Sequence, residues 1–143
     1  MPKGATTDND LLKLYFNATA IANMADNAAA SPFTSLYLAL HTADPTAAGD
    51  QTSSEATYTS YTRIAAARTV GGWTVTANAV ANAALAQFPQ CTGSTNTITH
   101  VTIGTASSGA GKILYVGALN ANLAVANLIQ PQFAIGALTA TET

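Results

Sequence analysis

The residues best able to carry chemistry in this chain are two histidines and a single cysteine. His41 has a carboxylate three residues further on, at Asp44, whereas Cys91 and His100 lie far along the chain from both. A zinc site needs three or four ligands, and neither histidine has a second ligand two or four residues away. Cys91 has no basic residue beside it to lower its pKa, as a nucleophilic cysteine requires. We therefore expect structural roles for these residues, with no catalytic group and no metal.

The glycine-rich segment GTASSGAGK, residues 104–112, superficially resembles a phosphate-binding loop. A P-loop requires a glycine where this chain has Ala106 and a hydroxyl residue where it has Ile113, followed by a helix. Here the sequence that follows is typical of a strand. We therefore predict a hairpin turn between two strands and no cofactor-binding site.

Three acidic residues, Asp44, Asp50 and Glu55, share one polar segment. Glycosidase chemistry needs two acids held rigidly across a cleft, and a calcium loop needs densely alternating carboxylates. The spacing is typical of neither, so we expect that the protein is not an enzyme. Trp73, which follows two glycines, is predicted either to anchor an interface or to plug one end of the fold.

Charged residues make up only 8% of the 143 residues, while hydrophobic residues make up 48%. The hydrophobic residues include 31 alanines, and the chain also contains 22 threonines. A formal net charge of −2 leaves no basic field to attract nucleic acid or a membrane surface. The N-terminal sequence lacks the apolar core of a signal peptide, and no apolar run is long enough to cross a bilayer. We expect synthesis in the cytoplasm, with neither nucleic acid nor a membrane as a partner.

Ten of the 12 charged residues lie between Lys3 and Arg68, so residues 69–143 are almost free of charge. A surface of Thr, Ser, Asn, Gly and Ala suits close contact with another protein, because no ammonium or carboxylate group has to lose its water. Few charges protect exposed strand edges, which favours self-association as a dimer or a trimer. The alternative is a β-protein that uses threonine as its ordinary solvent-facing residue.

Hydrophobic periodicity predicts one helix, over residues 8–26, preceded by a flexible N-terminus at residues 1–7. Pro32 lies beyond the end of this helix and favours extended backbone before it. Residues 33–141 instead alternate in the manner of strands, of which we predict about seven or eight. A long polar loop at residues 43–57 is expected on the surface.

One helix followed by evenly spaced short strands indicates a mainly β fold. We predict a single domain, residues 1–143, folded as an antiparallel, jelly-roll-like β-sandwich with an N-terminal α-helix. Residues 77–86 could be helical by propensity, but asparagine and valine weaken that preference, and both neighbouring segments are predicted strands. We therefore predict extended backbone there.

The segment LYLALHTADPTAAG, residues 36–49, resembles the opening strand of a group of small virion proteins from tailed bacteriophages. In that group a Tyr-x-Arg element follows, and residues 61–63, Tyr-Thr-Arg, match it. Residues 99–119 and 132–141 resemble the closing strands of the same group. The similarity keeps its order and covers most of the chain after the predicted helix.

This resemblance implies a non-enzymatic structural protein of the virion. The group includes capsid cement, or head decoration, proteins, which resemble jelly-roll domains seated on the major capsid shell, and it also includes tail-fibre proteins. Our main hypothesis is a cement protein on the capsid exterior, bound to the major capsid protein and to itself. By binding only the assembled shell, such a protein would stabilise the shell by mass action.

The alternative hypothesis is a tail-associated fibre or adaptor protein. A fibre that reads host glycans should display clustered aromatic and acidic residues. Tyr58, Tyr61 and Trp73 lie near Asp50 and Glu55 in the sequence. Copy number separates the two hypotheses, because cement is present in hundreds of copies on each particle and a tail component in far fewer.

Overall fold

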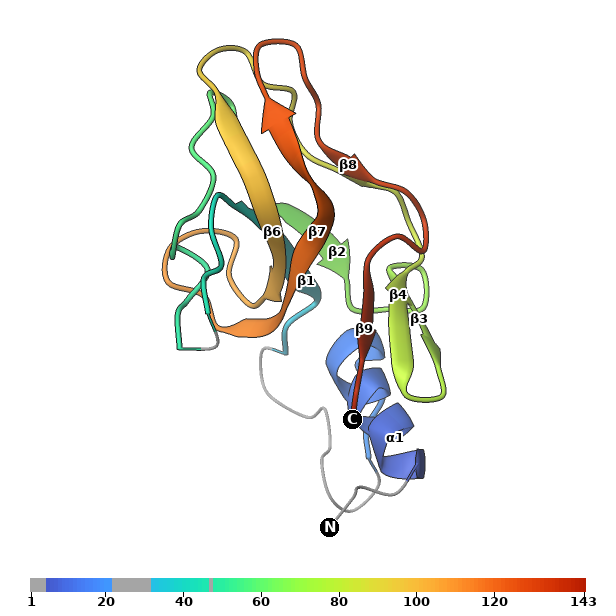
Figure 1. Ribbon diagram of the computed structural model, residues 1–143. Coiled ribbons are helices and arrows are strands. Elements are labelled where there is room, and N and C mark those ends of the chain that lie inside the picture. The colour runs from blue at the N-terminus through green and yellow to red at the C-terminus, as the bar shows by residue number, and fades with distance from the viewer. Residues whose placement is uncertain (1–4, 22–31, 47) are drawn as a thin grey trace. The chain divides into compact units, whose positions relative to one another are not determined.

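Figure 1 shows the computed structural model of the chain, which describes residues 5–21, 32–46 and 48–143. The fold is mainly β with one helix and antiparallel sheets, so the predicted fold class is confirmed. Among the described residues the elements are α1 (Ala5–Asn17), β1 (Ser35–His41), β2 (Ile64–Ala67), β3 (Trp73–Thr76), β4 (Ala79–Asn82), β5 (Ala86–Gln87), β6 (Asn96–Gly104), β7 (Ile113–Val125), β8 (Gln132–Phe133) and β9 (Thr139–Thr141). No helix in the described part is long and apolar enough to span a membrane.

The chain is organised in two compact units, each assembled from segments that are distant in sequence. The first draws on residues 1–35, 66–86 and 133–143, and the second on residues 36–65 and 87–132. Neither unit is therefore a continuous stretch of sequence. That the whole chain folds as a single domain remains a prediction.

The second unit is built mainly on a four-stranded sheet in the order β2-β1-β6-β7. The central strands β1 and β6 are antiparallel, with Tyr37 opposite Gly104 and His41 opposite His100. Alternate apolar side chains of the strands face inward and are joined by aromatic residues from the loops. The core of this unit consists of Leu36, Leu38, Leu40, Tyr58, Phe88, Ile98, Val101, Ile103 and Val125.

Strand β7 lies beside β6 and is interrupted by a bulge. Opposite Ile98 lies Leu123, and opposite His100 lies Ala118, so β7 advances five residues where β6 advances two. The extra residues let one strand continue through both regular stretches of the ladder. With this bulge the strand reaches Val125.

The first unit packs helix α1 against the sheet β3-β4-β9. The rings of Phe16 and Trp73 meet edge to face, with centroids 4.7 Å apart. Leu12 and Val80 are buried in the same unit, and Trp73 has no exposed surface. Of the two roles predicted for Trp73, the structure therefore gives it the packing role and not that of an exposed anchor.

Helix α1 begins three residues before the predicted start at Asp8 and ends at Asn17, short of the predicted end at Asp26. Ala18 adopts a left-handed conformation with φ 53°, which breaks the helical path. Residues 22–26 of the predicted helix lie outside the described residues. The apolar periodicity therefore continues past the point where the helix stops.

The helix ends where it does because a distant arginine binds its last carbonyl groups. Arg68 donates from Nε to the Tyr15 carbonyl (2.7 Å) and from Nη2 to the Leu14 carbonyl (2.6 Å). It also donates from Nη1 to the Phe33 carbonyl at 2.7 Å. A cation at this end of a helix interacts favourably with the helix dipole.

Replacing Arg68 by alanine should therefore destabilise α1. We expect a loss of about 1–2 kcal/mol in the free energy of unfolding, because three charge-assisted hydrogen bonds are removed at a partly exposed site. Urea unfolding followed by far-ultraviolet circular dichroism measures this loss. Lys13→Ala, which removes a cation from the same helix, is the matched control and should change stability by less than about 0.5 kcal/mol.

Candidate functional site

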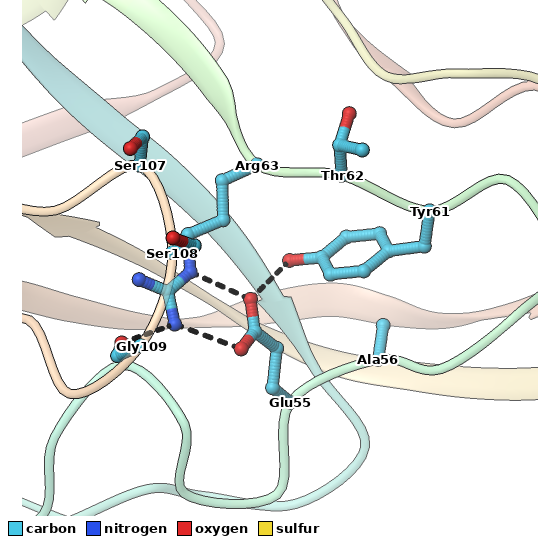
Figure 2. Close-up of a pocket in the computed structure, with 8 residues that line it drawn as sticks. All are labelled: Glu55, Ala56, Tyr61, Thr62, Arg63, Ser107, Ser108 and Gly109. Atoms are coloured by element: carbon cyan, nitrogen blue, oxygen red, sulfur yellow. Dashed lines mark hydrogen bonds and ion pairs between the residues drawn. The ribbon is translucent and has the colours of Figure 1, made fainter.

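A pocket of about 240 Å³ lies in the second unit, where three loops meet. Figure 2 shows that its lining comes from the polar loop, from the segment before β2 and from the glycine-rich turn. The lining residues are Glu55, Ala56, Tyr61, Thr62, Arg63, Ser107, Ser108 and Gly109. The pocket thus brings together Glu55, the Tyr-x-Arg element at residues 61–63 and the glycine-rich segment.

The centre of the cluster is a bidentate ion pair between Arg63 and Glu55. The guanidinium donates from Nε to Glu55 Oε1 (2.6 Å) and from Nη2 to Oε2 (2.8 Å). The arginine side chain is only 2% exposed and that of the glutamate 20%. The hydrogen bonds to Glu55 raise the pKa of Arg63 above its ordinary value, so the guanidinium stays charged.

The same guanidinium also holds the glycine-rich turn. Arg63 Nη1 donates to the carbonyl of Ala106 (3.0 Å), and Nη2 donates to the carbonyl of Gly109 (2.8 Å). Gly109 has a φ of 72°, the left-handed backbone that glycine adopts without strain. Residues 104–112 thus include the turn that joins β6 to β7, held by a cation, which confirms the predicted hairpin turn.

Tyr61 connects this ion pair to the central strand β1. Its hydroxyl donates to Glu55 Oε1 (3.0 Å) and accepts the backbone N–H of Leu40 at 3.0 Å. Burial raises the pKa of Tyr61 above its ordinary value, so the hydroxyl stays protonated and can donate. The ring stacks on Phe88 with a centroid separation of 6.3 Å.

A buried glutamine, which the sequence analysis did not single out, lies under the same turn. Gln51 has no exposed surface, and its amide donates to the Tyr37 carbonyl and accepts the Ala106 N–H. A Cβ at Gly104 would lie 2.2 Å from Gln51 Cδ, and one at Gly111 would lie 2.1 Å from Gln51 Oε1. Both glycines are therefore needed to make room for this amide.

His41 holds the polar loop against the sheet. Its Nδ1 lies 2.9 Å from the Ser53 carbonyl, and its Nε2 lies 2.9 Å from Thr102 Oγ1. The carbonyl can only accept, so Nδ1 carries the proton and Nε2 accepts from the threonine hydroxyl. Burial lowers the pKa of His41 below its ordinary value, which keeps the ring neutral.

This neutral, buried histidine predicts a loss of stability in mild acid. The unfolded chain binds a proton at His41 near pH 6.5, whereas the folded chain binds it only at lower pH. Stability should therefore be constant above about pH 6.5 and should fall as the pH drops below that value. Unfolding by urea at pH 5 and pH 7.5 tests this, and in the His41→Gln variant the difference between the two pH values should be smaller.

The other residues singled out from the sequence serve local roles. Asp44 accepts the N–H of Thr46, and Asp50 accepts the N–H of Thr52, so each closes its own turn. Buried Cys91 donates to the carbonyl of Gly93. Among the described residues, no three His, Cys, Asp or Glu side chains gather where they could hold a metal ion.

The polar loop at residues 43–57 is more buried than expected. It returns antiparallel to the end of β1, where His41 and Glu55 form a bridge and Ala56 N–H donates to the Leu40 carbonyl. Gln51 and Ala56 are buried, which corrects the expectation of a surface loop for these two residues. The polar groups at the loop's base need these partners because they are shielded from water.

Chemically, the cluster suits clamping better than catalysis. Both oxygens of Glu55 accept hydrogen bonds, and four of the five N–H groups of Arg63 donate to protein oxygens. A carboxylate bound in this way is a poor base, because removing a proton from a substrate would break its ion pair. The site therefore acts to fix three loops in one position.

The chain matches the sequence model of a protein family over nearly its whole length. The sequence model of one family, described as podophage GP4 fiber I protein gp80, matches residues 5–141. No curated protein matches the chain. The matched residues include helix α1, strands β1 to β9 and the cluster formed by Glu55, Tyr61 and Arg63.

Proposed function

The chain belongs to the podophage GP4 fiber I protein family and is a structural protein of a phage virion, and from this premise we propose that it is a tail-associated fibre or adaptor component. The family match is the observation that supports the proposal. It favours the tail-fibre alternative over the capsid cement hypothesis, which no comparison supports.

We further propose that the protein works through its surfaces and not as an enzyme. The loops that could have formed a reactive site are bound to one another by Arg63, Glu55 and Tyr61. A fibre component must keep its shape while it transmits force and contacts other proteins. Loops fixed by charge-assisted hydrogen bonds suit that requirement.

Purified particles provide the test of the tail location. Immunogold labelling with an antibody against this chain should place gold on the tail, and quantitative gel analysis should give a few to a few dozen copies per particle. Labelling over the whole capsid with hundreds of copies would overturn the proposal and restore the cement hypothesis, with the major capsid protein as the partner.

A further inference from the structure

Strand β7 is the longest strand among the described residues, yet it contributes almost nothing to the core. Of its 13 residues only Val125 is buried, and each of the other twelve is at least partly exposed. The strand is nevertheless apolar, with the sequence ILYVGALNANLAV, and Val116, in its regular stretch Tyr115–Ala118, is 40% exposed. A single copy of the chain therefore leaves the apolar surface of this strand uncovered.

β7 is also the last strand of its sheet. In the order β2-β1-β6-β7 it has β6 on one side and no strand on the other, as Figure 1 shows for the orange strand beside β6. An edge strand offers N–H and C=O groups to a further strand, and proteins usually protect such edges with lysine or proline. β7 contains neither, and residues 113–141 contain no charged residue at all. Its bulges, which also blunt an edge, lie on either side of Tyr115–Ala118, so this stretch is the regular part of the edge beside Val101.

The apolar exposure continues in the turn beyond the strand. Leu128 is 68% exposed and has a φ of 70°, a conformation that is costly for a residue with a side chain. Its N–H donates to the Cys91 carbonyl, and its carbonyl accepts from the Gln90 side chain. The strained turn is thus held by hydrogen bonds that keep a leucine in solvent, and strain of this kind is typical of functional surfaces.

The absence of charge indicates which partner fits this edge. A partner that carried lysine or glutamate on its own edge would have to strip water from that charge without gaining an ion pair. A second copy of β7 brings no charge, so the two edges meet without repulsion or desolvation of ions. The other free edge of the sheet, β2, has only four residues and is flanked by Arg63 and Arg68, so it is a poorer match for β7.

We propose that β7 is a self-association surface, at which its regular stretch Tyr115–Ala118 pairs antiparallel with the same stretch of a second copy to form a two-fold dimer. Such an interface is isologous, because each copy contributes the same strand. Backbone hydrogen bonds then satisfy both edges, while side chains such as Val116 lose their exposure. This proposal rests on the assignment of the chain as a virion component that works through surfaces.

The test uses the purified full chain and a lysine placed in the proposed interface. The wild type should sediment as a dimer, and Val116→Lys should raise the dissociation constant of that dimer at least about tenfold, because two lysines would face each other near the two-fold axis. Val70→Lys is the matched control: this valine is 76% exposed in the turn before β3, and its replacement should leave the dimer intact.

Hydrogen exchange distinguishes the loss of the dimer from a folding defect. In the wild type, backbone amides of β7 should become better protected as the protein concentration rises, while those of the β3–β4 hairpin should not change. A monomeric or trimeric wild type would overturn the proposal, and so would a Val116→Lys variant that remains dimeric. The tail location is measured on particles and the dimer on purified chain, so either proposal can fail without the other.

Discussion

Arg63→Met is expected to lower the free energy of unfolding by about 3–5 kcal/mol, which is a large part of the total stability of a small protein. The methionine replaces the aliphatic part of the arginine but none of its donors. Glu55 then keeps a largely buried charge without its cation, and the carbonyls of Ala106 and Gly109 lose their donors. Guanidinium unfolding monitored by circular dichroism measures the loss.

A double-mutant cycle separates the ion pair from the rest of the cluster. In the background Glu55→Gln no charge is left unpaired when the arginine is removed, so Arg63→Met should cost less there than in the wild type. Arg63→Lys should also be destabilising, because an ammonium group cannot bind both carboxylate oxygens and two carbonyls in the same geometry. A loss below about 1 kcal/mol for Arg63→Met would show that the hydrogen bonds and ion pair of Arg63 contribute little to stability.

The Arg63 variants also reveal which loops the clamp holds. Because the guanidinium binds both the polar loop and the glycine-rich turn, hydrogen exchange should quicken in residues 48–57 and 105–112 of Arg63→Met. The β3–β4 hairpin, which belongs to the first unit, should exchange as in the wild type. Equal acceleration throughout the chain would instead indicate global destabilisation.

The β character of the chain could be predicted from its sequence because alternation is a local signal. Residues 33–141, which include β1 and β6, were predicted to form strands because their apolar residues alternate. Residues 77–86 were predicted to be extended, which is correct for β4 at Ala79–Asn82, whereas Ala77, with a φ of 51°, lies in the turn before it. The helix boundary was predicted wrongly for a physical reason. The group that caps α1 is Arg68, which is 53 residues from its acceptor at Tyr15, and no local pattern reports such a contact.

Only some of the buried polar residues, in the candidate site and elsewhere, could be identified from the sequence. Glu55 was singled out as one of three acids in the polar segment, and the Tyr-Thr-Arg element through the resemblance. Their ion pair and shared hydrogen bonds explain why they occur together. Gln51 and Asn82 were missed, although both are buried, and the amide nitrogen and amide oxygen of each form hydrogen bonds. A neutral amide in a chain rich in polar residues gives no sign that it will be buried, because its burial depends on partners brought by other segments.

The glycines around Gln51 were interpreted from the sequence as a turn, but the structure shows that two of them serve packing. Gly104→Ala is expected to lower the free energy of unfolding by about 3 kcal/mol, because the new Cβ would overlap the Gln51 amide and displace it from two hydrogen bonds. The backbone at Gly104 is not left-handed, so the cost arises from the contact and not from φ. Thermal and urea unfolding give the size of the loss.

A second substitution identifies the cause. In the background Gln51→Ala the space is empty, so Gly104→Ala should cost close to nothing there, and the coupling between the two positions should approach the full cost of the single glycine substitution. Gly117→Ala is the matched control, because a Cβ at Gly117 in β7 would meet no atom within 4 Å. That variant should be neutral or slightly stabilising, since alanine has less backbone entropy to lose than glycine. If Gly104→Ala were as harmless as Gly117→Ala in the wild type, Gln51 would be free to move aside, and it could not be what holds the glycine-rich turn against β1.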